Sequence, residues 1–195
     1  MEQALTKSEA YHIHRLFAQV ISVFNSCEID FWLTGGSLLG QVRCGGMILC
    51  DDDIDIAINL KDKEFLYSHE FQKRLKWLRL KLVKPSHLYY KIKYENCEED
   101  IWIDICLIDQ NGLDLRKDKK KRQYMEGEIY PLRPVKFSQI RGDVFIPNKA
   151  EQYLDRIFPE WKTTAQIYNH KDHKKSKVTV PLTDIINVPV KYYYK

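Results

Sequence analysis

The chain has 195 residues, 44% of them hydrophobic and 30% charged, and its formal net charge is +4. This length suffices for one well-packed domain, and the 12 Tyr, 8 Phe and 4 Trp favour a folded chain over a disordered one. The mild positive charge suits phosphate-bearing ligands but falls short of the basic footprint of a nucleic-acid binder. We therefore do not expect nucleic acid as a partner.

Cysteine usage and hydropathy point to the interior of the cell. The five cysteines are odd in number and lack the two-residue spacing of zinc or redox pairs, so we interpret them as reduced thiols. The N-terminus shows no apolar signal core, and no stretch reaches the roughly 18 apolar residues of a membrane span. We expect a cytoplasmic protein without a membrane span, folded as a single domain over 1–195, with a core at about 10–165 and a polar C-terminal tail.

The first part of the chain predicts a helix, two strands and the start of a second helix. Apolar residues at three- and four-residue spacing predict the first helix over 13–24. A short strand is expected at 29–33, and the glycine pair 35–36 ends it, with a new helix starting at 37–39. Over 53–58, isoleucines alternate with Asp and Ala, which is typical of a half-buried strand.

The middle of the chain predicts one helix and three strands. Apolar spacing favours a helix over 65–78, and strands are expected at 80–84, 88–94 and 101–107. The last strand alternates in the same way as 53–58, with Ile and Leu on one face and polar or bulky residues on the other. The pattern thus predicts two half-buried strands that both carry aspartates.

The last part of the chain predicts a hairpin and a helix. The hairpin joins 135–140 to 144–146 around a Gly-Asp turn. Asn148 is expected to cap a helix that runs to residue 158, with Glu151 reaching back as in a capping box. The basic run 116–122 is interpreted as a solvated segment rather than a docking site for an anionic polymer.

The aspartates on the two alternating strands are the candidate catalytic residues. Asp53 and Asp55 share one strand face, about 6.5–7 Å apart along the strand. Two carboxylates at that distance repel by about 2–3 kcal/mol at an effective dielectric constant near 20. A divalent cation such as Mg²⁺ compensates this repulsion, and Asp104 on the later strand would complete the ligand set. Asp51, just before the strand, is a further candidate metal ligand; a solvated acidic loop is the alternative for it.

A candidate anion site precedes these aspartates. Gly35 and Gly36 would let the backbone approach a ligand closely, and the following helix N-terminus presents unpaired N–H groups. Ser37 could add a hydroxyl group to a bound phosphate. The alternative is a plain glycine turn with Ser37 as helix cap. The position of this turn, one short loop before an Asp-x-Asp strand, favours a nucleotide-phosphate site.

Together these features resemble the polymerase-β-like nucleotidyltransferase superfamily, and more closely the LicD family, which includes the fukutin-related proteins. The resemblance spans roughly residues 10–165. Its motifs are LTGGSLLGQVR at 33–43, the Gly-Gly pair 45–46, DDDIDI at 51–56, YKIK at 90–93, WIDI at 102–105, and several matches between 129 and 154. The expected fold is α+β, with a mixed sheet flanked by helices.

The resemblance implies a metal-dependent phosphotransferase. It would move a phospho-alcohol group (phosphocholine-, ribitol- or glycerol-phosphate-like) from a CDP-linked donor to a glycan acceptor. Mg²⁺ or Mn²⁺ would be held by Asp53, Asp55 and Asp104, and the alternative role of Asp104 is to accept the proton of the acceptor hydroxyl. The expected phosphate-binding residues are Gly35, Gly36, Ser37, Arg43, Lys91 and Lys93. For the two lysines, an exposed strand face is the alternative.

Two other functions fit the same residues. A nucleotidyltransferase would carry the same aspartates and glycine turn but would transfer NMP from an NTP to a small molecule, a protein or RNA. A non-catalytic nucleotide- or glycan-binding module would keep the scaffold and lose turnover. The products distinguish them, because the first releases pyrophosphate and the second releases nothing.

Overall fold

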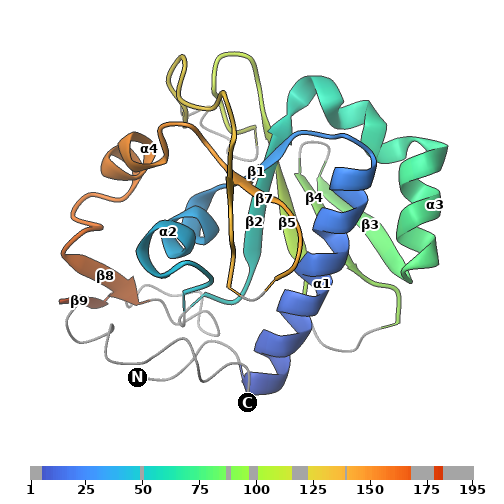
Figure 1. Ribbon diagram of the computed structural model, residues 1–195, viewed down its shortest axis with the longest axis horizontal. Helices are drawn as coiled ribbons and strands as arrows, with labels where there is room; N and C mark the ends of the chain where they lie inside the picture. The colour runs from blue at the N-terminus through green and yellow to red at the C-terminus, as the bar shows by residue number, and fades with distance from the viewer. Residues whose placement is uncertain are drawn as a thin grey trace.

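The computed structural model describes residues 6–48, 51–86, 89–96, 101–115, 123–138, 140–167 and 178–181. Its centre is a five-stranded sheet in the order β1-β2-β5-β4-β3 (Figure 1). The strands are β1 (Phe31–Leu33), β2 (Ile54–Asn59), β3 (Leu80–Ser86), β4 (Tyr89–Tyr94) and β5 (Ile103–Ile108). Only β2 and β5 run parallel, so the sheet is mixed. The α+β architecture predicted from the sequence is confirmed.

One face of the sheet packs against α1 (Lys7–Ser26) and α3 (His69–Trp77), which lie to the right in Figure 1. A capping box starts α1, because the Thr6 side chain accepts from the backbone N–H of Glu9 and the Glu9 side chain accepts from Thr6. The apolar stripe predicted over 13–24 is buried, and Phe24 contacts the Phe31 ring edge-on at 5.5 Å. The isoleucines of β2 belong to the same core.

The single helix predicted over 65–78 is wrong in its boundaries. The structure has a 3-10 helix, η1 (Leu60–Tyr67), followed by α3. Ser68 separates them: its backbone is extended, and its hydroxyl accepts a hydrogen bond from Phe71 N–H at 3.2 Å. A serine that caps a helix satisfies a free N–H and thereby begins a new helix, which the apolar spacing does not reveal.

Helix α2 (Gly35–Cys44) begins earlier than predicted. The glycine pair forms its first turn instead of preceding it, and Thr34 is the N-cap residue. Thr34 is extended, and its carbonyl accepts from Leu38 N–H at 3.1 Å. The helix ends at Gly45, which is left-handed with φ 71°. The two glycines therefore lie at the helix N-terminus, next to the start of β2.

The C-terminal part contains a hairpin and a helix, displaced from their predicted positions. The hairpin pairs β6 (Arg133–Val135) with β7 (Val144–Ile146), so its first strand ends where 135–140 was expected to begin. Helix α4 (Ala150–Ile157) has Lys149 as its N-cap and no side-chain cap, so the Asn148–Glu151 capping box is wrong. Beyond it, β8 (Thr164–Ile167) pairs with β9 (Val178–Pro181).

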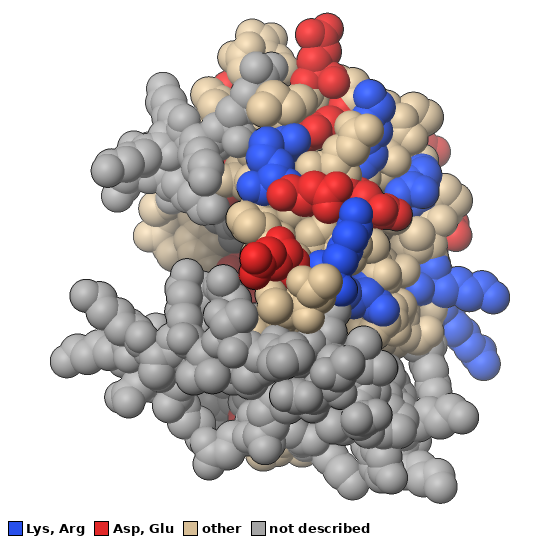
Figure 2. All heavy atoms as spheres, turned by 90° about the vertical axis from the view of Figure 1, so that its left-hand side faces the viewer, with Lys and Arg blue, Asp and Glu red and all other residues tan. Residues whose placement is uncertain are grey.

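Helices α2 and α4 lie together on the left in Figure 1. On the described part of that side, Lys and Arg side chains are interspersed with Asp and Glu (Figure 2). Lys162 Nζ, for example, lies 3.7 Å from Glu151 Oε2 and 3.1 Å from Asp155 Oδ1. The charges on this side of the molecule are thus partly balanced by local ion pairs.

Some sequence expectations lie outside the described residues. They are the basic run 116–122 and most of the polar tail after residue 167. Among the described residues, Cys27, Cys44 and Cys106 are thiols rather than disulfides. Within the described ranges, no helix combines the length and the apolar character that crossing a membrane requires.

Candidate active site

The predicted carboxylates meet at the start of β2 and β5. Asp55 and Asp104 are direct neighbours across the parallel pair, and Asp53 immediately precedes β2. One carboxylate oxygen from each of the three lies within 4.8 Å of the others. Asp104 is only 5% exposed. The structure therefore brings together the three residues that the sequence singled out.

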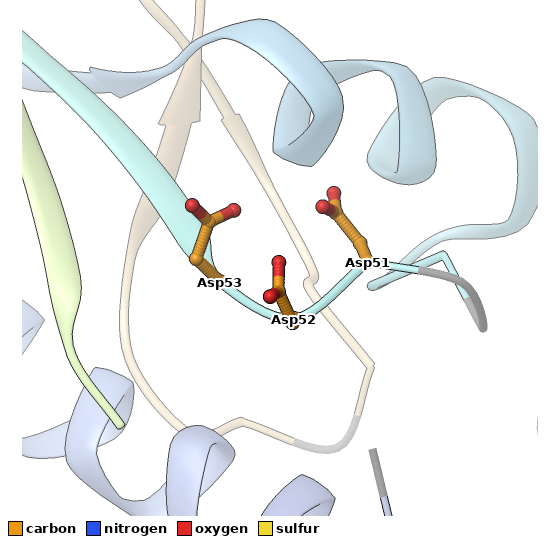
Figure 3. A group of neighbouring side chains, drawn as sticks. All are labelled: Asp51, Asp52 and Asp53. Carbon is orange, nitrogen blue, oxygen red and sulfur yellow. The ribbon is translucent and has the colours of Figure 1, made fainter. Parts of the chain in front are cut away.

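A second acidic group adjoins the first. Asp51, Asp52 and Asp53 also present oxygens within 4.8 Å of one another, so Asp53 belongs to both groups. Figure 3 shows the three side chains on the loop that leads into β2, with Asp51 pointing toward α2. Asp51, which the sequence left undecided between ligand and solvated loop, is thus part of the cluster.

Negative charge on the cluster is strongly disfavoured. Burial, followed by repulsion from Asp55 and Asp51, raises the pKa of Asp53 to about 9. Burial, followed by repulsion from Asp55 and Asp52, raises the pKa of Asp51 to about 7. Convergent carboxylate oxygens are the donor set that hard divalent cations prefer, and a cation would relieve this repulsion. The acidic cluster could therefore bind a metal ion.

The glycines of α2 lie directly against these carboxylates. A Cβ atom on Gly35 would come within 2.7 Å of Asp55 Oδ2, and one on Gly36 within 2.5 Å of Asp51 Oδ2. Gly35 also has a left-handed φ of 56°. Only glycine permits this approach, which sets the positive end of the α2 dipole beside the aspartates. The glycine pair and the acidic cluster form one site.

Ser37 joins the helix to the strand that follows the acidic loop. Its hydroxyl accepts a hydrogen bond from Asp55 N–H at 2.8 Å, and the side chain is 1% exposed. Thr34 N–H donates to the Asp55 carbonyl at 3.2 Å, one residue before the helix. In this arrangement Ser37 holds Asp55 in place from within the protein, whereas a phosphate contact was expected.

Two buried tyrosines support the glycine turn. Tyr124 and Tyr153 stack with ring centroids 4.5 Å apart, and the Thr34 hydroxyl contacts both hydroxyl groups, at 2.8 and 3.3 Å. Gly35 N–H donates to the Tyr153 hydroxyl at 3.4 Å. Burial raises the pKa of Tyr153 to about 12, so its hydroxyl stays neutral at physiological pH. The tyrosines fix the backbone that contacts the aspartates.

The three predicted phosphate-binding cations occupy different places. Lys91 lies opposite Asp104 across β4 and β5, with Nζ 3.6 Å from Asp104 Oδ1. Lys93 follows two residues later on the same face of β4. Arg43 lies in the last turn of α2, and its guanidinium donates to the carbonyls of Trp161 and Thr164. Lys91 is thus the one of these three that forms an ion pair with the acidic cluster.

Sequence reasoning missed the aromatic residues of the site. Tyr153 lies 118 positions from Gly35, and no local pattern connects them. Tyr89 donates to Asp104, and it precedes Lys91 by two residues on the same strand face. Period-two alternation could therefore have identified Tyr89 once β4 was placed beside β5.

The sequence comparisons identify the family of the chain. The family model of the LicD/FKTN/FKRP nucleotidyltransferase domain matches residues 28–149, more than half of the chain. An uncharacterized protein of Rickettsia typhi, RT0683, is 30% identical over 87% of this chain and 53% of its own length. Another from Rickettsia prowazekii, RP689, is 27% identical over 85% and 60%. The chain thus spans little more than half the length of these relatives.

A shorter match and two solved structures complete the comparison. Human ribitol 5-phosphate transferase FKRP is 44% identical over 43 residues, which is 22% of this chain and 9% of that protein. The crystal structure of ANT(2″)-Ia with adenylyl-2″-tobramycin has a TM-score of 0.47 at 12% identity, covering 75% of this chain and 78% of that one. Terminal uridylyl transferase 4 from Trypanosoma brucei has a TM-score of 0.33 at 14% identity, covering 52% and 31%.

Proposed function

The chain belongs to the LicD/FKTN/FKRP nucleotidyltransferase domain family, and we propose that it is a metal-dependent phosphotransferase. Its donor is a CDP-linked phospho-alcohol of the phosphocholine, ribitol-phosphate or glycerol-phosphate type, and its acceptor is a glycan hydroxyl. The observation that carries this proposal is the convergence of Asp53, Asp55 and Asp104 beside the glycine-rich start of α2. The partial match to a ribitol 5-phosphate transferase supports the class of group transferred.

The reaction is an in-line displacement at the β-phosphorus of the donor. The bond between that phosphorus and the bridging oxygen breaks, and CMP leaves with the electron pair. The acceptor oxygen forms the new bond to the same phosphorus and gives up its proton to a base. Mg²⁺ or Mn²⁺, when bound, supplies charge neutralisation on the pyrophosphate.

The residues of the site have separate roles in this proposal. Asp53 and Asp55 hold the metal ion, and Asp51 extends the ligand set. Gly35 and Gly36 form the first turn of α2, whose N–H groups donate to a phosphate of the donor. Asp104 is either a ligand of a second ion or the base that accepts the hydroxyl proton.

The cations divide into two groups by their surroundings. Lys91 and Lys93 lie on the active face of β4, where an ammonium group can pair with donor phosphate. Arg43 would have to break its hydrogen bonds to the carbonyls of Trp161 and Thr164 before it could pair with a donor phosphate. We therefore assign Arg43 to holding the segment after α4 against α2.

The test is a donor screen with purified protein. CDP-choline, CDP-ribitol, CDP-glycerol and the four NTPs are each incubated with Mg²⁺ or Mn²⁺ and a panel of glycan acceptors, and released nucleotide is separated by chromatography. CMP release from one CDP-alcohol is expected. Pyrophosphate release from an NTP would instead identify a nucleotidyltransferase. Donor binding without any turnover would identify a binding module.

Asp53→Asn is the decisive variant in that screen. It removes one metal-binding charge from the residue shared by both acidic groups, so we expect turnover to fall at least 10³-fold, about 4 kcal/mol of transition-state stabilisation. The matched control is Asp143→Asn, because Asp143 is an exposed acid in the loop between β6 and β7. Near-normal activity of Asp53→Asn, with Asp143→Asn also active, would contradict the assignment.

A further inference from the structure

We propose that Tyr89 is a positioning residue, which fixes the Asp104 carboxylate so that it faces the metal-binding aspartates. This inference rests on the proposed function, because it concerns the same metal site. It adds to the aspartates a residue on a third strand, β4, that holds one of them from outside the metal-binding group.

The hydrogen bond between the two side chains is short and its direction is fixed. The Tyr89 hydroxyl donates to Asp104 Oδ2 at 2.5 Å. Lengths of about 2.5–2.7 Å are typical of an O–H donor bound to an ionised carboxylate, where the bond is roughly twice as strong as a neutral one. A phenol also has few rotatable bonds, so it restricts its partner at little conformational cost.

Sheet register explains why Tyr89 is the residue that reaches Asp104. Lys91 is opposite Asp104 in the antiparallel pair of β4 and β5, and Tyr89 is opposite Cys106. Tyr89 is therefore the diagonal neighbour of Asp104 on the same face of the sheet, within reach of a long aromatic side chain. The hydroxyl approaches Asp104 from the β4 side, whereas Asp55 lies beside it on the β2 side.

The second contact of Asp104 is also held in place. Lys91 Nζ lies 3.6 Å from Oδ1, and it sits 3.4 Å from the centre of the Trp102 ring and 5.4 Å from that of Tyr89. An ammonium group between two aromatic faces is restricted in position. Oδ2 thus accepts a hydrogen bond from β4, whereas Oδ1 has an ion-pair contact with the same strand at a distance beyond hydrogen bonding. Tyr89 is therefore the residue of β4 that orients the carboxylate.

Direct metal binding tests the inference without relying on turnover. Mn²⁺ alone is titrated into the full chain and its free concentration is followed by electron paramagnetic resonance. Wild type is compared with Tyr89→Phe, which removes only the hydroxyl group. Loss of an outer-shell partner costs roughly 10–100-fold in metal affinity, so we expect Tyr89→Phe to weaken Mn²⁺ binding by about tenfold. A thermal melt verifies that the variant folds.

Tyr67→Phe is the matched control. The Tyr67 hydroxyl donates to the Tyr90 hydroxyl at 3.1 Å, and Tyr90 points to the opposite face of β4. This variant also loses one tyrosine hydrogen bond, but away from the aspartates, and its Mn²⁺ affinity should equal that of wild type. Weaker binding by both variants to the same degree would overturn the inference, since general loosening of β4 would then explain it.

A double-mutant cycle separates positioning from packing. In an Asp104→Asn background, Tyr89→Phe should change Mn²⁺ affinity less than about twofold, because the group it positions no longer bears the charge. Equal effects in both backgrounds, or wild-type affinity in Tyr89→Phe, would overturn the inference. So would a wild-type protein that binds no Mn²⁺. Failure of the proposed function has a different signature, namely the expected Mn²⁺ cycle together with no CMP release from any donor.

Discussion

At the scale of single residues, the acidic cluster lowers the conformational stability of the metal-free protein, and a bound cation would restore it. Asp53 and Asp51 lie near Asp55, and both have a raised pKa because burial and mutual repulsion disfavour their charged forms. Groups with strongly perturbed pKa values are common at functional sites. The cluster therefore lowers the stability of the metal-free fold, as is expected where a ligand binds.

The raised pKa values make the stability of the metal-free protein depend on pH. In the unfolded chain the pKa of these carboxyl groups is about 3.9. Between about pH 4 and pH 9 the folded state therefore binds more protons than the unfolded state. The free energy of unfolding contributed by these groups is therefore highest below pH 4 and falls as pH rises toward 9. In EDTA, we expect wild type to lose more stability than Asp53→Asn between pH 6 and pH 8.

Urea unfolding of the two proteins at both pH values measures this difference, and added Mg²⁺ should restore wild type most at pH 8. Metal binding displaces protons from its ligands, so the gain grows with pH. Identical pH slopes for wild type and Asp53→Asn would mean that Asp53 is already charged in the metal-free fold.

At the scale of elements, the start of α2 and the start of β2 are built as one unit. Gly35 leaves no room for a side chain beside Asp55, and Ser37 accepts the Asp55 N–H. The helix terminus that would receive donor phosphate is thus tied to the strand that carries the proposed metal ligands. A displacement of either element would move both halves of the site.

Replacing Gly35 by alanine should damage both folding and metal binding. The left-handed φ costs roughly 1–2 kcal/mol for an L-residue, and the new Cβ would also displace the Asp55 carboxylate. Gly45→Ala is the matched control, because Gly45 has a φ of 71° but its added Cβ would meet no atom of the described residues within 4 Å. Chemical unfolding and Mn²⁺ titration compare the two variants.

Both variants should lose similar conformational stability from the backbone strain, but only Gly35→Ala should lose Mn²⁺ affinity and CMP release. Equal metal affinity in the two alanine variants would show that Asp55 does not need the space that Gly35 leaves.

At the scale of the whole molecule, a partly buried ion pair connects the segment before the hairpin to α4. Arg156 donates to both oxygens of Glu128, at 2.7 and 2.6 Å, and to the Gln123 carbonyl at 2.8 Å. Met125 N–H also donates to Glu128. Tyr153 also lies on α4, so the Arg156–Glu128 ion pair helps to position the tyrosine whose hydroxyl accepts the Gly35 N–H.

Glu128→Gln should lower the free energy of unfolding by about 2 kcal/mol, because Glu128, 5% exposed, loses its charge-assisted hydrogen bonds to Arg156, whose side chain is 28% exposed. Glu70→Gln is the control: its pair with Arg74 joins one helical turn of α3 at the surface, where solvent screens both charges, so we expect a much smaller loss. Urea denaturation measures both. Equal small losses would show that solvent already screens the Glu128–Arg156 pair.

The sequence by itself determined the strands and the acidic residues of the site. Alternation of Ile with Asp around Asp53 and Asp104 predicted two half-buried strands, and β2 and β5 lie close to where that pattern placed them. Half-burial is wrong for β5, whose six residues are all buried because it is the central strand of the sheet. Alternation is a local property, because side chains two apart on a strand share a face whatever the rest of the fold is. The family motifs around 33–56 belong to the same contiguous segment, so their resemblance could also be recognised without a structure.

Only the tertiary structure decided how distant segments meet. Asp55 lies beside Asp104 because β2 and β5 pair in that register, although two helices and two other strands separate them along the chain. The contacts of Arg43 with Trp161, and of Gly35 with Tyr153, each bridge 118 positions. Such contacts depend on which elements pack together, and that is set by burial over the whole core rather than by any local spacing. Short sequence motifs therefore identify the acidic and glycine residues of the candidate site, whereas the packing of the whole core determines which distant residues hold them in place.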